Sequence, residues 1–414
     1  MEKKIHKSYK YRIYPTKEQE VFLLKHFGSV RFVYNHFLAE RKEQYDKTGK
    51  SDNYYKQAKS LTELKKQEEY NWLKEANSQT LQSALRNLES AYVNFFSGRS
   101  KFPRFKKKTR KNSFCVPQLV KVENGKIYIP KLKKLDGIKM IEHRKLQGKI
   151  LFATFSKTPT NKYFVSITVQ QDYNSKQPTN KEIGIDLGIK DLIITSNGSK
   201  FKNHKFISKF EKQLKKAQQH LSRKQKGSKR RERQRLKVAL IHEKIHNCRL
   251  DNLHKISHKL VMENDVVYME NLNVKGMLKN HNLAKAVSDC SWSELKTQLH
   301  YKGDWDDTYI HEIFRFYPSS KTCSNCGHIM DSMSLDIRQW ECPKCGKQHD
   351  RDINAAINIL KEGKRELIEE KSSSAGTVDY TNGENVRPSN CKMEKADLNE
   401  VGSLFFALAK GSSL

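Results

Sequence analysis

Residues 184–190 read GIDLGIK, and they place one aspartate inside an otherwise apolar, β-branched run. The isoleucine and leucine side chains alternate with glycine and Asp186 at a period of two, which is typical of a β-strand. A carboxylate in such a strand is costly unless it is paired, hydrogen-bonded or bound to a metal. Gly184 and Gly188 share a face with Asp186 and leave room beside it. The pattern therefore predicts that another group approaches this carboxylate.

Two further acidic residues lie in ordered contexts. The stretch DVVYMENLNVKGM (265–277) predicts a second apolar strand that ends on Glu270. The stretch HDRDINAAINIL (349–360) places Asp352 at the start of an alanine-rich helix. Three such acids suit a two-metal nuclease, because Mg²⁺ prefers oxygen ligands and two ions stabilise both oxygens of a phosphodiester displacement.

Each of the three acids also has a purely structural interpretation. Asp186 could be a satisfied buried carboxylate, Glu270 an ordinary strand-end acid and Asp352 a helix N-cap. Their joint occurrence in one strongly basic chain favours the nuclease interpretation.

The charge of the chain predicts a polyanionic partner. The 414 residues include 79 Lys plus Arg and 46 Asp plus Glu, which gives a formal net charge of +33. Such a surplus repels itself unless a polyanion neutralises it, so we expect nucleic acid, although charge does not distinguish DNA from RNA. No apolar run reaches the roughly 18 residues of a membrane span, and the basic start lacks a secretory signal. We therefore expect a soluble, cytoplasmic protein of about two or three domains.

Four of the eight cysteines follow a metal-binding pattern. Two residues separate Cys323 from Cys326, and two residues separate Cys342 from Cys345. This arrangement predicts a closed, structural zinc site with four thiolates, and the glycine after each pair permits a tight turn. Two nearby histidines, His328 and His349, are spare candidates for metal ligands. The other four cysteines are isolated in the sequence and are given no chemical role: Cys115, Cys248, Cys290 and Cys391.

The first half of the chain predicts a β-domain with a helical insertion. Residues 5–14 read as a strand, and Thr16 opens a helix in which Gln19 completes a capping box. A second helix follows Ser78, and residues 115–171 are rich in predicted strands that form a small β-barrel or sheet together with the first strand.

The second half contains a long charged stretch and a polar tail. Residues 205–262 predict a helical hairpin that is broken near Gly227. Residues from about 371 are rich in Ser, Gly and Asn and predict a disordered or loosely docked tail.

Two basic stretches predict contacts with nucleic acid. In residues 96–114, Phe102, Phe105 and Phe114 interleave with cations, and such rings can stack on bases while cations hold phosphates. Residues 224–237 give the hairpin a basic face. The structural alternatives are a solvated loop anchored by core phenylalanines and an exposed, salt-bridged helix. The predicted contact residues are Lys101, Arg104, Lys106, Lys107, Lys108, Arg230 and Arg231.

Several motifs resemble the TnpB family, also called OrfB, of insertion-sequence-encoded RNA-guided DNA nucleases related to the type V CRISPR effectors. The resemblance spans roughly residues 5–365. The matching stretches are GIDLGIKDL, MENLNVKGM, SWSELKTQLHYK, FYPSSKTCSNCG, CPKCG and HDRDINAAINI, with RIYPTKEQE and SQTLQSALRNLESAYVNFF nearer the N-terminus.

The resemblance implies an α/β multidomain fold. A RuvC, RNase H-like nuclease domain carries an inserted four-cysteine zinc finger, and a wedge-type β-barrel carries a helical recognition insertion. The implied boundaries are 1–15 and 110–180 for the barrel, 16–109 for the helical domain, 181–315 and 349–370 for the nuclease domain, 316–348 for the zinc finger and 371–414 for the tail.

The resemblance also implies roles for individual residues. Asp186, Glu270 and Asp352 correspond to the catalytic acids of the family and would bind Mg²⁺ or Mn²⁺, with Asp350 as a rival for the third role. The implied partners are a guide RNA from the transposon end and double-stranded target DNA, in a prokaryotic cytoplasm and with a monomer favoured. Ser78, Gln79 and Gln82 are candidates to contact a short target-adjacent motif, or else an N-cap and exposed glutamines.

Two other functions stay open. A three-acid DNA transposase would use a similar fold and similar metals but would join strands without a guide RNA. A guide-directed or zinc-ribbon DNA-binding regulator would bind DNA without cutting it, and its binding would survive Asp186→Ala. The intact trio of acids weighs against the regulator.

Overall fold

The computed structural model describes residues 2–108, 112–132, 135–334 and 336–375. Two compact units make up the chain, and we describe each by itself. The N-terminal unit contains Lys4–Tyr173, and the C-terminal unit contains the described residues from Asn174 onward together with the first residues of the chain. Within the described residues, no helix is long and apolar enough to cross a membrane.

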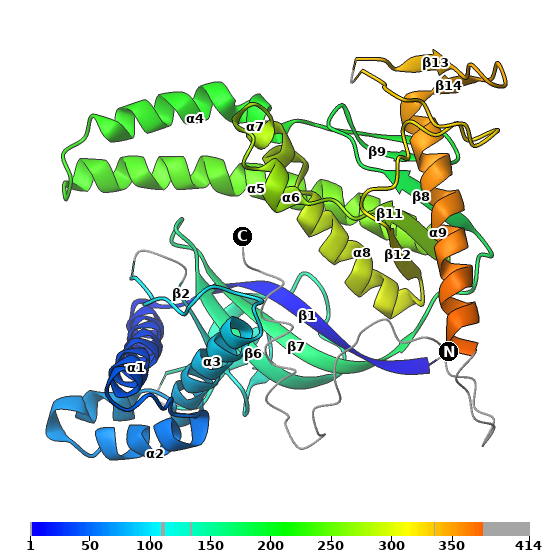
Figure 1. The fold of residues 1–414 in the computed structure, drawn as a ribbon. Helices are drawn as coiled ribbons and strands as arrows, with labels where there is room; N and C mark the ends of the chain where they lie inside the picture. Colours follow the sequence, from blue (N-terminus) through cyan, green and yellow to red (C-terminus); the bar gives the residue numbers. More distant parts are fainter. Residues whose placement is uncertain (1, 109–111, 133–134, 335, 376–414) are drawn as a thin grey trace. The chain divides into compact units, whose positions relative to one another are not determined.

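A seven-stranded sheet forms the base of the N-terminal unit (Figure 1). Its strands are β1 (Glu2–Tyr14), β2 (Asn112–Val116), β3 (Lys121–Glu123), β4 (Lys126–Tyr128), β5 (Ile138–Ile141), β6 (Lys149–Lys157) and β7 (Tyr163–Asn174). The order is β2-β6-β7-β1-β5-β4-β3, so the first strand lies in the middle of strands that follow it by more than 100 residues. The predicted sheet is confirmed, and a closed barrel stays a prediction.

Helices cover this sheet. They are α1 (Lys17–Thr48), α2 (Tyr54–Leu64), the 3₁₀ helix η1 (Glu68–Glu75) and α3 (Ser78–Phe96). Helices α1 and α3 contact β2, and α2 packs against α3. The capping box at Thr16 and Gln19 is confirmed. Ser78 does not cap α3, because the side chain of Asn77 accepts the hydrogen bond from the Gln79 amide.

A five-stranded sheet forms the centre of the C-terminal unit. Its strands are β8 (Glu182–Asp186), β9 (Asp191–Thr195), β10 (Lys200–Lys202), β11 (Val266–Glu270) and β12 (Tyr309–Ile313), in the order β10-β9-β8-β11-β12. Strands β8, β11 and β12 are parallel. Their carboxyl ends therefore share one edge of the sheet, the usual location of ligand sites in open α/β sheets.

The sheet of the C-terminal unit has helices on both faces. They include α4 (Phe206–Ser222), α5 (Lys229–Glu263), α6 (Val274–Met277), α7 (His281–Cys290), α8 (Trp292–Asp306) and α9 (Arg351–Ala375). The predicted hairpin is confirmed as α4 and α5, with Gly227 at a positive φ of 86° in the turn. Along β11, Val267 and Met269 pack with α5 and α8, whereas Tyr268 packs with α9.

Helix α9 approaches the sheet closely because each side of the contact has a glycine, Gly184 on the sheet and Gly363 on the helix. A Cβ atom on Gly184 of β8 would lie 2.2 Å from the Ala356 carbonyl oxygen of α9. A Cβ atom on Gly363 of α9 would lie 2.2 Å from the Tyr268 ring of β11. The space predicted beside Asp186 is filled at both glycines, by the backbone of α9 at Gly184 and by the carbonyl of Asp191, the first residue of β9, at Gly188.

The C-terminal helix is longer than the sequence suggested. The composition predicts a tail from about residue 371, whereas α9 continues to Ala375. The rest of the predicted tail, residues 376–414, lies outside the described residues.

A candidate active site and a candidate zinc centre

Three elements of the C-terminal unit bring the predicted acids to one edge of the sheet. Asp186 ends β8 and Glu270 ends the adjacent parallel strand β11. Asp352 lies in the first turn of α9, which packs on β8. Asp186 shares a strand face with Gly184, and Glu270 shares one with Tyr268, so both point to the side on which α9 packs.

The electrostatics of these carboxylates reflect burial and mutual repulsion. Burial is the main cause that raises the pKa of Asp186 well above its usual range, and the Glu270 and Asp352 carboxylates raise it further. Burial also raises the pKa of Glu270, and a hydrogen bond from Ser319 partly offsets that effect. Buried like charges disfavour ionisation, and a bound cation removes this penalty. Among the described residues, only the four cysteines bring their ligand atoms within 4.8 Å of one another, so a divalent metal at the three carboxylates stays a prediction.

The two aspartates at the start of α9 have different roles in the structure. Asp350 caps the helix, because its Oδ1 accepts hydrogen bonds from the amides of Asp352 (3.1 Å) and Ile353 (3.2 Å). Asp350 also forms an ion pair of 2.7 Å with Lys200. The structural interpretation of Asp352 as the N-cap is thus wrong, and its carboxylate instead meets the Arg338 guanidinium at 3.3 Å.

Ser319 is a site residue that sequence reasoning missed. Its buried hydroxyl donates a hydrogen bond of 2.6 Å to Oε1 of Glu270, and its carbonyl accepts a bond of 2.8 Å from the Asn358 amide group. The serine follows Glu270 by 49 residues, so no local pattern links the two. Ser319 therefore orients one of the three acids from the loop after β12.

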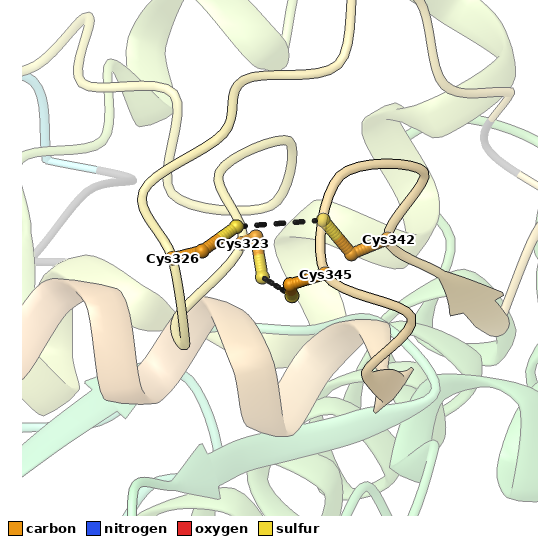
Figure 2. A group of neighbouring side chains, drawn as sticks. All are labelled: Cys323, Cys326, Cys342 and Cys345. Carbon is orange, nitrogen blue, oxygen red and sulfur yellow. Dashed lines mark hydrogen bonds between the residues drawn. The ribbon is translucent and has the colours of Figure 1, made fainter.

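The four predicted metal-binding cysteines lie together. Figure 2 shows the thiols of Cys323, Cys326, Cys342 and Cys345 turned toward a common centre. All four sulfur atoms lie within 4.8 Å of one another. The pairs Cys323–Cys345 and Cys326–Cys342 are 3.7 and 3.6 Å apart. Tetrahedral zinc with bonds of about 2.3 Å would separate its sulfurs by roughly 3.8 Å, so this group suits Zn²⁺.

The two halves of the cysteine cluster have matching backbone turns. Gly327 follows the first pair and donates its amide to the Cys323 carbonyl, and Gly346 does the same to the Cys342 carbonyl. Both glycines have a positive φ, 76° and 68°, which disfavours other residues. The tight turns predicted from the two glycines are confirmed.

One of the two spare histidines reaches the cysteine cluster. Nε2 of His349 lies 3.1 Å from the Cys323 sulfur. This ring can support the site from outside the set of four thiols.

Buried asparagines connect the cysteine cluster to α9. Asn354 donates to the Thr322 carbonyl at 2.7 Å and accepts from the Ser324 amide at 2.9 Å. Asn358, one turn later, donates to the same Thr322 carbonyl at 2.6 Å. These bonds fix the start of the cluster against the helix that carries Asp352. Asparagines four residues apart on an otherwise apolar helix face are the signal that could have identified them.

The nucleic-acid candidates of the N-terminal unit differ in their accessibility. Phe114 is buried in the core, so stacking by this ring is ruled out, whereas Phe102 and Phe105 are exposed. The ammonium of Lys106 turns inward, 3.9 Å from the centre of the Tyr34 ring, although the residue as a whole is exposed. Burial of that ammonium lowers the pKa of Lys106 to about 8. The other candidates are exposed or partly exposed: Ser78, Gln79, Gln82, Lys101, Arg104, Lys107 and Lys108.

The two arginines predicted on the helical hairpin are not equivalent. Arg231 donates hydrogen bonds of 2.8 Å to the Leu221 and Lys224 carbonyls and thereby closes the α4–α5 turn. Arg230 is exposed. The basic face of the hairpin stays a prediction, and Arg230 is better placed than Arg231 to contact a ligand.

Comparisons with known proteins agree with this arrangement. Three family models match the chain: OrfB, described as "Probable transposase", at residues 164–281; the Cas12f1-like TNB domain at residues 292–359; and an OrfB helix-turn-helix domain at residues 1–50. In the structure this last range holds one strand and the single long helix α1.

Relatives cover nearly the whole chain. A protein of Streptomyces pristinaespiralis is 39% identical over 88% of this chain and 90% of its own length, and InsQ of Escherichia coli K12 is 32% identical over 86% and 92%. Both carry the name "Putative RNA-guided DNA endonuclease". The solved structure titled "Cryo-EM structure of the Cas12f1-sgRNA-target DNA complex" shares the fold, with a TM-score of 0.53 at 15% identity over 86% of this chain and 99% of that chain. The chain belongs to the TnpB (OrfB) family.

Proposed function

We propose that this protein is an RNA-guided DNA endonuclease of a transposable element. It takes a guide RNA from the transposon end and cuts double-stranded DNA next to a short target-adjacent motif. The names of the relatives support this activity. The observation that carries it is the convergence of Asp186, Glu270 and Asp352 at the carboxyl edge of one sheet.

The C-terminal unit serves as the nuclease module in this proposal. We assign residues 181–315 and 349–370 to a RuvC-like, RNase H-like domain, with residues 316–348 as its inserted zinc finger. The parallel strands β8, β11 and β12 and the crossing helix α9 support the assignment. We assign residues 1–15 and 110–180 to the wedge-type barrel and residues 16–109 to its helical recognition insertion; most of both ranges lies in the N-terminal unit.

The metals of this proposal follow from the donor atoms. The three carboxylates offer only oxygen, which suits Mg²⁺ or Mn²⁺, whereas four thiolates suit a structural Zn²⁺. When bound, divalent cations at the carboxylates would activate water and neutralise charge on the attacked phosphate.

The residues of the chain prepare the site for this chemistry. Ser319 orients Glu270 through its hydrogen bond of 2.6 Å. The cap from Asp350 fixes the first turn of α9, so that Asp352 is held on the face toward the sheet. Asp186 is partly buried at the end of β8, and the reduced access of water strengthens its interaction with any cation. Arg338 must give up Asp352 when a metal enters, since it contacts both carboxylate oxygens.

The basic surfaces bind the nucleic acids in this proposal. Guide pairing supplies the target sequence, and the protein holds backbones with cations. The loop of the N-terminal unit and the hairpin of the C-terminal unit provide these cations, namely Lys101, Arg104, Lys107, Lys108 and Arg230, whereas Lys106 and Arg231 are engaged within the protein. The start of α3, with Ser78, Gln79 and Gln82, contacts the target-adjacent motif.

The decisive experiment uses the protein co-expressed with its own flanking DNA, so that a guide RNA can copurify. The bound RNA is sequenced, and the complex is incubated with Mg²⁺ and plasmids that carry the matched target beside randomised bases. We expect cuts that depend on the guide and disappear in Asp186→Ala. The matched pair Asp352→Asn and Asp350→Asn separates the two aspartates, because asparagine preserves a helix cap but is a poorer metal ligand than a carboxylate.

Each alternative function predicts another result. Guided binding without cutting by the wild type would indicate a regulator. Strand joining without bound RNA would indicate a transposase. Cutting that survives in Asp352→Asn but not in Asp350→Asn would reassign the third acid.

A further inference from the structure

Two exposed aromatic rings lie at the carboxyl end of β12. The side chains of Phe314 and Phe316 are 64% and 78% exposed, and Phe316 is the most exposed of the large apolar side chains among the described residues. Their ring centres are 5.7 Å apart at an interplanar angle of 67°. This edge-on arrangement leaves faces of the rings open to a ligand. Exposing so much apolar surface to water is unfavourable in free energy, and a partner that covers the rings would remove that cost.

The segment that carries these rings is held firmly. The amide of Phe314 donates to Glu366 of α9 at 3.0 Å, and the Tyr317 amide closes a turn onto the Phe314 carbonyl. Ser319 at the end of the segment is buried and bonded to Glu270. The rings are therefore exposed by a rigid loop that the structure fixes at both ends.

The loop lies directly beside the candidate active site. Ile313, the last residue of β12, pairs with Glu270 at the end of β11. Arg315 donates through Nε to the carbonyl of Asn271 at 3.2 Å and through Nη2 to its side-chain oxygen at 3.4 Å. The two rings and the guanidinium thus stand at the same edge of the sheet as the three acids.

From this arrangement we infer that Phe314, Arg315 and Phe316 form a binding platform for unpaired DNA at the entrance to the acid site. Bases of the strand to be cut stack on the two rings, and Arg315 holds a neighbouring phosphate. This inference rests on the proposed function, because it names the form in which the DNA substrate reaches that site.

Unpaired nucleic acid fits this platform better than a duplex or a protein does. Bases in a duplex already stack on one another, so exposed rings gain most from bases that are splayed apart. Arg315 uses two of the five donors of its guanidinium on Asn271, which leaves donors for phosphate oxygens. The platform also belongs to a chain with a net charge of +33, which draws polyanions to its surface.

The test uses the full chain in complex with its guide RNA and a fluorescent base in the DNA. Guide-matched duplexes carry one 2-aminopurine at successive positions of the displaced strand, and the protein carries Asp186→Ala so that the strand stays intact. Stacking on a ring quenches 2-aminopurine. We expect quenching at a few adjacent positions, lost when Phe314→Ala and Phe316→Ala are combined, and kept in Phe316→Trp. Ile368→Ala on α9, a side chain that is 67% exposed, serves as the control and should leave the quenching unchanged.

A second measurement uses protein with all three acids intact. With both rings replaced by alanine, the KM for cutting a guide-matched single strand should rise roughly tenfold or more, because stacking contributes substantially to the affinity for each base. If the wild-type complex cuts and the ring variants show the same quenching and the same KM, the platform is overturned. The proposed function would still stand in that case. A ring variant that changes only the sedimentation of the complex would also overturn it, and would identify the rings as a protein contact. Wild-type complex that binds RNA but never cuts would instead refute the proposed function.

Discussion

Gly184 permits a perturbation of the candidate active site that changes none of its carboxylates. An alanine Cβ at this position would lie 2.2 Å from the Ala356 carbonyl oxygen and 2.7 Å from the Leu360 amide nitrogen, and both are backbone atoms of α9. Ordinary contacts begin at 3.4 Å, so β8 and α9 must separate by about 1 Å. Since α9 carries Asp352 and β8 carries Asp186, the alanine moves these two carboxylates apart.

The expected cost follows from that displacement. A misplacement of about 1 Å at a reacting centre can lower a rate on the order of 100-fold. Overpacking a core contact lowers the free energy of unfolding by about 1–3 kcal/mol. We therefore expect Gly184→Ala to cut a guide-matched plasmid about 100-fold more slowly in single-turnover assays, while it still binds its guide RNA and shows a modestly lower unfolding temperature.

Gly28 provides the matched control. It lies in α1, and a Cβ there would meet nothing within 4 Å, so alanine should stabilise the helix by about 0.5–1 kcal/mol and leave cutting unchanged. If Gly184→Ala cuts as fast as the wild type and unfolds at the same temperature, the close contact between β8 and α9 is refuted. An equal loss of activity in both variants would refute the reasoning from the displaced carboxylates.

Three further predictions test other parts of the C-terminal unit. Ser319→Ala should slow guided cutting about tenfold, because the Glu270 carboxylate loses the hydrogen bond that orients it. Ser319→Thr keeps the hydroxyl and should retain most of the rate. Equal cutting rates for the wild type and Ser319→Ala would contradict this role. Cys342→Ser should lower the zinc content and the unfolding temperature together, as measured by metal analysis and calorimetry, and a variant with full stability would show that the cluster is not structural. Burial lowers the pKa of Lys302 to about 8 from 10.5, so the unfolded state binds more protons between these values. The free energy of unfolding should accordingly rise with pH from about 8 to about 10, by at most about 3 kcal/mol, and Lys302→Met should flatten this slope in urea titrations; the same slope in both proteins would exclude Lys302 as its cause.

Local patterns predicted the individual elements because each pattern reports on one segment. The period of two around Asp186, the capping box at Thr16 and the turn at Gly227 all depend on residues within a few positions of one another. The four cysteines were equally predictable, since their pairs come from two short turns and the chemistry of thiolates demands their meeting.

Resemblance to a family, rather than periodicity, linked Asp186, Glu270 and Asp352 as one set. By itself, the sequence predicted two strands with terminal acids, the helix start near Asp352 and a charge that favours a nucleic-acid partner. It did not show which aromatic and basic side chains are buried in the core or bonded within the protein, and are therefore unable to contact a ligand. Phe114, for example, follows the same aromatic–basic pattern as Phe105 but is buried.

Only the tertiary structure decided the contacts between distant segments. It placed β8 next to β11, gave the helix cap to Asp350 rather than Asp352, and brought Ser319 to Glu270 across 49 residues. It also left Phe314 and Phe316 exposed on an anchored loop beside the acids. The physical reason is that secondary structure follows from spacing along the chain, whereas burial and hydrogen-bond partners depend on which segments pack together in space.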